Sequence, residues 1–337
     1  MLNIGVVGYG YWGPNIVRNF SAVPGAKVVA VCDQDHRALQ KVQRNYPDML
    51  VTQDSNDIIF APDIDAVAVI TPVSTHYEIA KKALLNGKHI FVEKPFTASI
   101  QQAEELIELA ERKNLTIMVD HTFLFTGSVK KIKEYIDDDV LGAIYYFDSI
   151  RINLGLFQRD VNVIWDLAPH DLSIMNYLIG KQPVAVAATG ISHFGNEIEN
   201  VAYITIYFPG NLIAHFNLSW VSPVKIRTTL IGGDKKMIVW NDLSADEKIR
   251  VYDRGVDQAQ SLSKENERSL RMNYRTGDMW SPRVEEMEAL KCEAEYFVAC
   301  VNNNQRPIND GIAGLDVVRI LQTTERSLKT GGEVLYL

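Results

Sequence analysis

The sequence predicts an α/β protein of two domains: an N-terminal doubly wound parallel sheet and a C-terminal α+β domain built on a large, mostly antiparallel open sheet. Up to residue 121, short apolar runs alternate with amphipathic stretches, as a parallel sheet with crossover helices requires. Beyond that point, long strand patterns follow one another with few helices between them. Because 337 residues are too many for one ordinary core, we place the domains at 1–121 and 122–337.

Each apolar run of the N-terminal domain is short, as expected for a buried strand, and is followed by a helical pattern. The helix at 99–113 illustrates this, because Ala103, Leu106 and Ala110 share one face. The expected strands are 3–8, 27–32, 66–70, 89–92 and 115–119. The expected helices are 13–22, 35–45, 75–86 and 99–113.

The C-terminal domain has longer strand patterns. The expected strands are 143–153, 184–194, 200–208, 211–219, 225–231 and 235–240, and the expected helices are 127–138, 166–179, 284–303 and 311–329. Gly331-Gly332 ends the last helix before a short strand. The segment 253–283 is polar, with Gln258, Ser261, Ser263, Lys264 and Glu265 among few large apolar residues, and we expect a long loop there.

A glycine-rich turn after the first strand indicates a dinucleotide site. Gly8 permits the tight turn, Gly10 lets the backbone approach a pyrophosphate, and Gly13 allows the next helix to pack closely. Asp33 ends the second strand, where its carboxylate can accept both ribose hydroxyls, and this favours NAD. NADP is the less favoured alternative, since Arg37 lies nearby. The loop residues expected to contact the cofactor are Gly8, Gly10, Tyr11, Trp12 and Gly13. The domain is therefore predicted to have a Rossmann fold.

Glu93-Lys94-Pro95 follows the strand 89–92, at the carboxyl edge of the sheet where open α/β folds bind ligands. We therefore expect Glu93 and Lys94 to lie at the cofactor. Pro95 makes the preceding peptide bond the best candidate for a cis bond in the chain. The alternative is a surface lysine before a loop.

Asp166 and His170 form a second candidate pair. Pro169 is tolerated in the first turn of a helix, so the helix is expected to begin close to Asp166, with both side chains on one face. The positive end of the helix dipole would then help to keep His170 neutral, as a general base for an alcohol must be. The alternative is an N-cap aspartate with an incidental histidine.

Other polar residues follow strands of the same sheet. Thr71-Pro72 follows the strand 66–70, and its hydroxyl can reach the nicotinamide ribose, while Ser74-Thr75 is open to either that role or helix capping. His76 is a possible cofactor contact or a packed histidine at a helix start. His121 ends another strand and falls in the same region. All of these are candidates for the cofactor site.

The strand 143–153 places Arg151 and Asn153 on one face by alternation. They could bind substrate hydroxyls or phosphate, or they could lie at a solvent-exposed strand end. These two residues are therefore substrate candidates with a structural alternative.

Composition excludes several classes of function. A formal charge of -8 disfavours nonspecific nucleic-acid binding, and no long uninterrupted apolar stretch predicts a membrane span. Cys32, Cys292 and Cys300 are scattered without zinc-ligand spacing, and no metal is expected. Met1 leads directly into the first strand, so we expect a cytoplasmic protein.

Together these motifs resemble the glucose-fructose oxidoreductase, inositol dehydrogenase and related (Gfo/Idh/MocA) family. The resemblance rests on the glycine fingerprint, Thr71-Pro72 with His76, the run from Gly87 to Pro95, and Asp166 with His170. It implies NAD(P)-dependent hydride transfer at a sugar or cyclitol carbon. In the family pattern, Lys94 and His170 match the catalytic lysine and histidine, and Asp166 matches the accompanying acid.

The stretches 151–155 and 165–171 further resemble the branch of bacterial UDP-N-acetylglucosamine 3-dehydrogenases and UDP-N-acetylaminoglucuronate dehydrogenases. This resemblance implies oxidation of carbon 3 of a UDP-linked amino sugar for surface-polysaccharide or lipid A synthesis. The substrate set is then Lys94, Arg151, Asn153, Trp165, Asp166 and His170. The alternatives are a free-sugar or inositol dehydrogenase and a non-catalytic NAD-binding regulator. One uncovered sheet face favours a homo-oligomer, a dimer or tetramer.

Overall fold

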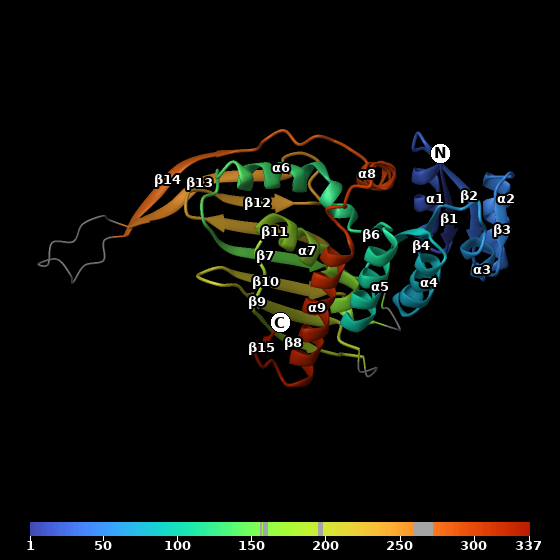
Figure 1. Cartoon of the computed structure of the whole chain (residues 1–337). Helices are drawn as coiled ribbons and strands as arrows, with labels where there is room; N and C mark the ends of the chain where they lie inside the picture. Colours follow the sequence, from blue (N-terminus) through green and yellow to red (C-terminus); the bar gives the residue numbers. More distant parts are fainter. Residues whose placement is uncertain (156, 158–160, 195–197, 259–271) are drawn as a thin grey trace, which may run out of the picture. The chain divides into compact units, whose positions relative to one another are not determined.

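The computed structural model describes residues 1–155, 157, 161–194, 198–258 and 272–337 (Figure 1). The chain forms two compact units. Unit 1 comprises Met1–Thr126 with Met287–Gln322, and unit 2 comprises Gly127–Glu286 with Thr323–Leu337. The units differ from a single division at residue 121, because helix α8 (Ala289–Asn303) and the first part of helix α9 (Gly311–Lys329) belong to unit 1 although they come late in the chain. In the described part of the chain, no helix is long and apolar enough to cross a membrane.

Unit 1 contains a parallel six-stranded sheet in the order β3-β2-β1-β4-β5-β6, which is the Rossmann order, and the predicted doubly wound sheet is confirmed. The short strand β3 and helix α3 were not predicted. The elements are β1 (Leu2–Val7), α1 (Gly13–Ser21), β2 (Ala26–Cys32), α2 (His36–Asn45), β3 (Leu50–Thr52), α3 (Ser55–Ile59), β4 (Ala66–Val69), α4 (Val73–Leu85), β5 (His89–Val92), α5 (Ile100–Lys113), β6 (Ile117–Val119) and the 3-10 helix η1 (Thr122–Phe125).

Helix α8 (Ala289–Asn303) completes the core of unit 1. Phe297 from α8 meets Phe20 from α1 and Phe91 from β5, with ring centroids 5.4 to 5.8 Å apart in edge-to-face contacts. All three rings are fully buried, and such pairs add to the stabilisation that apolar burial provides. This packing brings a segment from late in the chain into the core of unit 1.

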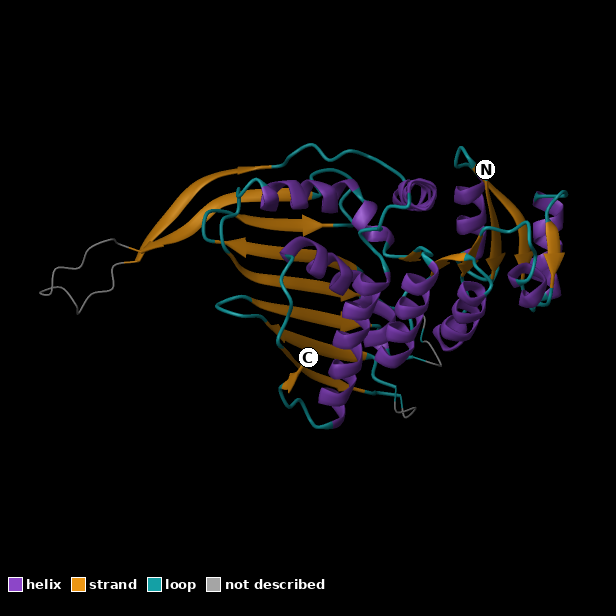
Figure 2. Ribbon diagram, viewed as in Figure 1, coloured by secondary structure: helices purple, strands orange, loops and turns teal. Residues whose placement is uncertain are grey.

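Unit 2 contains the predicted open sheet, with nine strands in the order β14-β13-β12-β11-β7-β10-β9-β8-β15. Strands β7 and β10 are parallel, and the other neighbouring pairs are antiparallel. The helices of this unit lie on one face of the sheet (Figure 2). The elements are α6 (Gly127–Asp137), β7 (Ile144–Ile152), α7 (Val163–Ile179), β8 (Ala185–Ile191), β9 (Val201–Tyr207), β10 (Ile213–Ser219), β11 (Ile226–Gly233), β12 (Met237–Asn241), β13 (Ile249–Gln258), β14 (Met272–Trp280) and β15 (Leu335–Tyr336), and α9 (Gly311–Lys329) contributes its last turns.

The prediction of a long loop over 253–283 is wrong at 253–258 and at 272–280, which are strand. Strands β13 and β14 pair there as an antiparallel ribbon, and Arg275 Nε donates to Asp253 Oδ1 at 3.0 Å across it. Most described side chains of β13 after Val251, and those of β14 from Tyr274 on, are at least partly exposed, so this part of the ribbon needs no apolar alternation and carries a loop-like composition. Residues 259–271, which include Ser261, Ser263, Lys264 and Glu265, lie outside the described residues.

The predicted start of the second-unit helix at Asp166 is also wrong. Helix α7 begins at Val163, and Asn162 caps it by accepting a hydrogen bond from the Trp165 backbone N–H at 3.2 Å. Pro169 therefore lies inside the helix, where tight packing of neighbours such as Leu172 offsets the lost backbone bond. His170 is two turns from the helix start, so the positive end of the dipole acts little on it.

Candidate active site

The glycine turn of unit 1 has the geometry of a phosphate cradle. A Cβ atom on Gly8 would lie 2.1 Å from the Ile70 carbonyl oxygen, and one on Gly13 would lie 2.6 Å from the Gly8 carbonyl oxygen. A Cβ on Gly10 would meet no protein atom within 4 Å. The chain's own packing thus requires Gly8 and Gly13, whereas the open space beside Gly10 fits a pyrophosphate that approaches the backbone.

A cavity of about 360 Å³ adjoins this turn at the carboxyl ends of β1, β2 and β4. It brings together five of the predicted cofactor residues, Gly8, Gly10, Asp33, Thr71 and Pro72. Thr75, which the sequence left open between a cofactor contact and helix capping, also lines it, as do Gln34, Gln53, Ser55 and Ile79, which were not predicted. Tyr11, Trp12, Gly13, His76, Glu93, Lys94 and His121 do not line it. The volume and the polar rim suit the adenosine half of a dinucleotide.

Asp33 is fixed at one end of this cavity. Its Oδ2 accepts the Tyr9 backbone N–H at 2.5 Å, and its Oδ1 accepts the Asp35 backbone N–H at 2.7 Å. Each carboxylate oxygen keeps capacity for another donor, so ribose hydroxyls can bind without displacing these contacts. The rings of Tyr11 and Trp12 are exposed and lie edge to face, with centroids 5.5 Å apart.

His76 connects the loop that follows β4 with the loop that follows β5. Its ring is fully buried, with Nδ1 3.0 Å from the Pro95 carbonyl oxygen and Nε2 2.7 Å from the Thr71 carbonyl oxygen. Burial lowers its pKa, against the opposing effect of these carbonyls. The ring nitrogens are thus used within the protein, and the residue holds the loop of Lys94, whose peptide bond to Pro95 is cis as predicted.

His121 differs from His76 because neither of its ring nitrogens has a hydrogen-bond partner, although the residue is buried. Burial, and secondly the charge of Lys94, lower its pKa to about 3, so the ring is neutral at physiological pH. Unpartnered buried nitrogens are costly unless a further group satisfies them. This observation fits the prediction that His121 contacts a bound cofactor.

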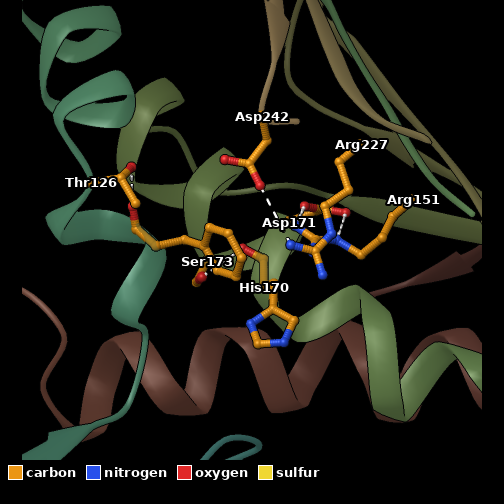
Figure 3. A network of polar contacts seen from close by, with 8 residues as sticks. Thr126, Arg151, His170, Asp171, Ser173, Arg227 and Asp242 are labelled. Atoms are coloured by element: carbon orange, nitrogen blue, oxygen red, sulfur yellow. Dashed lines mark hydrogen bonds and ion pairs between the residues drawn. The ribbon is translucent and has the colours of Figure 1, made fainter. Parts of the chain in front are cut away.

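In unit 2, Asp166 and His170 lie one turn apart on the partly exposed side of α7. Trp220 Nε1 donates to Asp166 Oδ2 at 2.9 Å, and Trp220 itself is buried. Figure 3 shows that the His170 imidazole points away from the neighbouring Arg151–Asp171 pair. The arrangement offers a carboxylate of fixed orientation and an imidazole on one helical face, a combination suited to general base catalysis. Trp220 was missed because nothing in its local sequence marks its partner.

Arg151 is buried, and its guanidinium contacts a carboxylate of the protein. Its Nε and Nη2 donate to the two carboxylate oxygens of Asp171 at 2.8 and 2.6 Å (Figure 3). Burial lowers the pKa of Arg151, but the paired carboxylate more than offsets this. The exposed strand end considered as its alternative is therefore wrong, and the bidentate pair instead joins β7 to α7.

Trp165 and Asn153 have different surroundings. Trp165 is largely buried, and its Nε1 donates to Glu325 Oε2 at 3.2 Å, so its polar atom joins α7 to α9. Asn153 follows the end of β7, where its backbone N–H donates to the Ser219 carbonyl at 3.1 Å. Asn153 is half-buried beside the segment that carries Trp220 and keeps its place as a substrate candidate.

Comparison with protein families decides the identity of this fold. Residues 2–121 match the oxidoreductase family with an NAD-binding Rossmann fold, and residues 129–239 match the Gfo/Idh/MocA C-terminal domain. The chain belongs to the Gfo/Idh/MocA oxidoreductase family. The resemblance predicted from its motifs is confirmed, and so are an NAD-binding fold and membership of an enzyme family.

Individual relatives act on different sugars. The chain is 25% identical to the UDP-N-acetylglucosamine 3-dehydrogenase of Acidithiobacillus ferrooxidans, over 94% of each chain. It is 28% identical to the scyllo-inositol 2-dehydrogenase (NAD(+)) of Bacillus subtilis, over 71% of this chain and 72% of that one. Its fold matches a levoglucosan dehydrogenase solved with NADH and L-sorbose, with a TM-score of 0.84, 20% identity and coverage of 100% and 98%.

Substitutions of the first two glycines should separate folding from cofactor binding. We expect Gly10→Ala to weaken NADH binding about tenfold or more at unchanged melting temperature, because its methyl group meets no protein atom but fills the pyrophosphate space. Gly8→Ala should instead lower the melting temperature, because it clashes with Ile70 and its φ of +104° is unfavourable for alanine. NADH titration by fluorescence and thermal unfolding check this. Unchanged NADH affinity in Gly10→Ala would contradict the cradle.

Removal of the Asp171 charge should be costly. Side chains of the Arg151–Asp171 pair are 6% and 5% exposed. Asp171→Asn is therefore expected to lower the free energy of unfolding by about 3 kcal/mol or more, since it leaves a buried guanidinium uncompensated. Asp242→Asn is the matched control, because its contact with Arg227 is longer, at 3.5 Å, and more exposed. Urea unfolding measures the free energy of unfolding of both variants. Equal decreases in the two variants would contradict the larger contribution of the Arg151–Asp171 pair.

Proposed function

We propose that this protein is an NAD-dependent dehydrogenase that oxidises a ring hydroxyl, at carbon 3, of a nucleotide-activated amino sugar for surface-polysaccharide or lipid A synthesis. The observation that carries the reaction class is the Asp166–His170 pair on the accessible side of α7, with Asp166 oriented by Trp220. Support for the UDP-linked substrate comes from the near full-length similarity to a UDP-N-acetylglucosamine 3-dehydrogenase. Support for the preference of NAD over NADP comes from the fixed carboxylate of Asp33.

The chemistry divides among three side chains. When bound, NAD accepts a hydride from the carbon that is oxidised. His170 takes the proton of the hydroxyl as the carbonyl forms, and Asp166 orients the sugar or the histidine. Lys94 donates a hydrogen bond to the substrate oxygen and stabilises its alkoxide character. The reverse reduction uses the same groups.

The main rival is oxidation of a free sugar or an inositol, which the similarity to scyllo-inositol 2-dehydrogenase favours. Arg151 was one candidate for a hydroxyl or phosphate contact, and its guanidinium is paired with Asp171. The second rival is a nucleotide-sensing regulator without turnover. Substrate range and turnover therefore distinguish the three.

The direct test is to mix the protein with NAD and, separately, with UDP-N-acetylhexosamines, UDP-N-acetylhexosaminuronates, inositols and free aldoses, while following nicotinamide absorbance. We expect reduction of NAD with a UDP-sugar, slower reduction with NADP, and competitive inhibition by UDP alone. Oxidation of inositols or aldoses without binding of UDP would establish the first rival. NAD binding without oxidation of any compound would establish the second.

Two variants test the roles assigned to Lys94 and His170. Lys94→Ala should reduce turnover about a hundredfold or more while NADH still binds. His170→Asn keeps size but removes the base, so oxidation should fall across the whole pH range. Near-normal turnover of either variant would remove that residue from the mechanism.

We also propose that the protein self-associates through the outer face of the large sheet, the face without helices in unit 2 (Figure 2). Large side chains stand on this face, including Tyr203 and Ile213, which are 44% and 41% exposed. Ile150 on β7 and Leu230 on β11 are partly exposed there as well. Apolar side chains alternate on this face with polar ones such as Asp148 and His215, and a second copy of the same face can cover both kinds, in a dimer or tetramer.

Charges placed on this face should dissociate the assembly. We expect the double variant Ile150→Asp/Leu230→Asp to sediment as a monomer, whereas the wild type and the control Leu243→Asp, at an exposed turn, sediment as oligomers. Sedimentation velocity measures this. A monomeric wild type would refute the proposal.

A further inference from the structure

A second cavity lies in unit 1, at the edge of the parallel sheet opposite the cofactor cavity. Its volume is about 310 Å³, which is within the range of small-molecule sites. It lies where β6 begins, and in a parallel sheet the strand starts lie together, away from the carboxyl ends that hold a dinucleotide. Among the described residues, none lines both cavities. This second cavity is therefore separate from the cofactor site.

The second cavity has an apolar floor. Ile107 and Ala110 come from one face of α5, Ile117 is the first residue of β6, and Pro307 lies between α8 and α9. Ala110, Ile117 and Pro307 are buried, and Ile107 is partly buried. Burial against such side chains favours the hydrocarbon part of a ligand.

The charged groups at this cavity leave a net negative charge. In the part of the chain that the structure describes, the charged side chains that line it are Glu111, Arg306 and Asp310. Arg306 Nε donates to Asp310 Oδ2, so these two charges offset each other. Asp310 Oδ1 also accepts the Ala313 backbone N–H at 2.9 Å, which satisfies a donor at the positive end of α9. The carboxylate of Glu111, exposed at the rim, is the charge that these contacts leave for a ligand.

Two helices end at the second cavity and add to its negative character. Asn114 caps α5 and Asn304 caps α8, both in the left-handed conformation, with φ of 53° and 51°, and both line the cavity. The next residues, Leu115 and Gln305, each donate a backbone N–H at 2.9 Å to a carbonyl of the last turn, so the two ends close in the same way. The carbonyl end of a helix carries a partial negative charge, which favours a cation nearby.

We propose that this cavity binds a small organic cation that consists of an ammonium group on an apolar stem. The stem contacts the floor at Ile107, Ala110 and Ile117. The ammonium group donates to the Glu111 carboxylate and faces the carbonyl ends of α5 and α8. An anion would be repelled by the same three groups, and a neutral ligand gains less from them. The site is distinct from those of the dinucleotide and the sugar, so the proposal goes beyond the proposed function.

The test follows the isoleucine Cδ1 methyl signals by NMR in the whole protein, saturated with NADH so that the cofactor cavity is occupied. The signals of Ile107 and Ile117, which line the second cavity, are assigned through Ile107→Val and Ile117→Val. Pentylammonium should shift both signals, with a dissociation constant of about 10 mM or lower, and leave Ile79 of the cofactor cavity unshifted. Pentanol has the same stem without the charge and should bind about threefold or more weakly.

Two variants assign the binding to this cavity. Glu111→Gln removes the rim charge and should weaken pentylammonium binding about threefold or more, with pentanol binding unchanged. Glu108→Gln is the matched control, because Glu108 is exposed one turn earlier on α5, pairs with Arg112 at 3.5 Å and does not line the cavity. Ala110→Leu enlarges a floor side chain and should abolish binding of both compounds. Thermal unfolding shows whether that variant is folded, and if it is not, Glu111→Gln alone decides.

The same titration distinguishes two sources of the ammonium group. Binding of N-acetyl-lysine amide that is tighter than that of pentylammonium identifies a lysine side chain of a polypeptide, and weaker binding identifies a free amine. The absence of a saturable shift at Ile107 and Ile117, equal affinities for pentylammonium and pentanol, or an unchanged pentylammonium affinity in Glu111→Gln overturns the proposal. None of these measurements uses a sugar, so their outcome is independent of the proposed function.

Discussion

The need to partner buried polar groups determines which side chains of this protein remain for a ligand. Arg151 lies on a strand that could face a sugar phosphate, yet its guanidinium is held by Asp171. Both ring nitrogens of His76 lie within 3.0 Å of backbone carbonyl oxygens, and Trp165 donates its N–H to Glu325. Each of these contacts stabilises the frame of the site and removes a candidate from direct recognition. His121, whose nitrogens have no protein partner, is the contrasting case.

The cofactor half of the site could be predicted because its chemistry is local. Within the turn, Gly13 is required by its contact with the Gly8 carbonyl, and the φ of +104° at Gly8 itself favours glycine. The position of Asp33 could be predicted because one helix and one strand separate it from the glycine turn. The sheet edge then places the residues that follow β4 and β5 beside them, and even the cis bond at Pro95 was indicated by its residue type.

The missing parts depend on partners far away in the chain. Trp220 orients Asp166 from 54 residues away, and Phe297 packs against Phe20 and Phe91 from a late helix of the first unit. No local pattern marks such pairs. The error at α7 has a similar origin. Local propensity places Pro169 in the first turn of a helix, whereas the buried packing of α7 stabilises the helix on both sides of the proline. The ribbon of β13 and β14 was missed because its accessible faces need no alternation.

The correction to α7 changes the argument for the base. Far from the helix start, His170 gains little from the dipole, so its fitness as a base rests on its accessible position one turn from Asp166. A base must lose and regain a proton near neutral pH, and an imidazole is the side chain whose ordinary pKa suits that role.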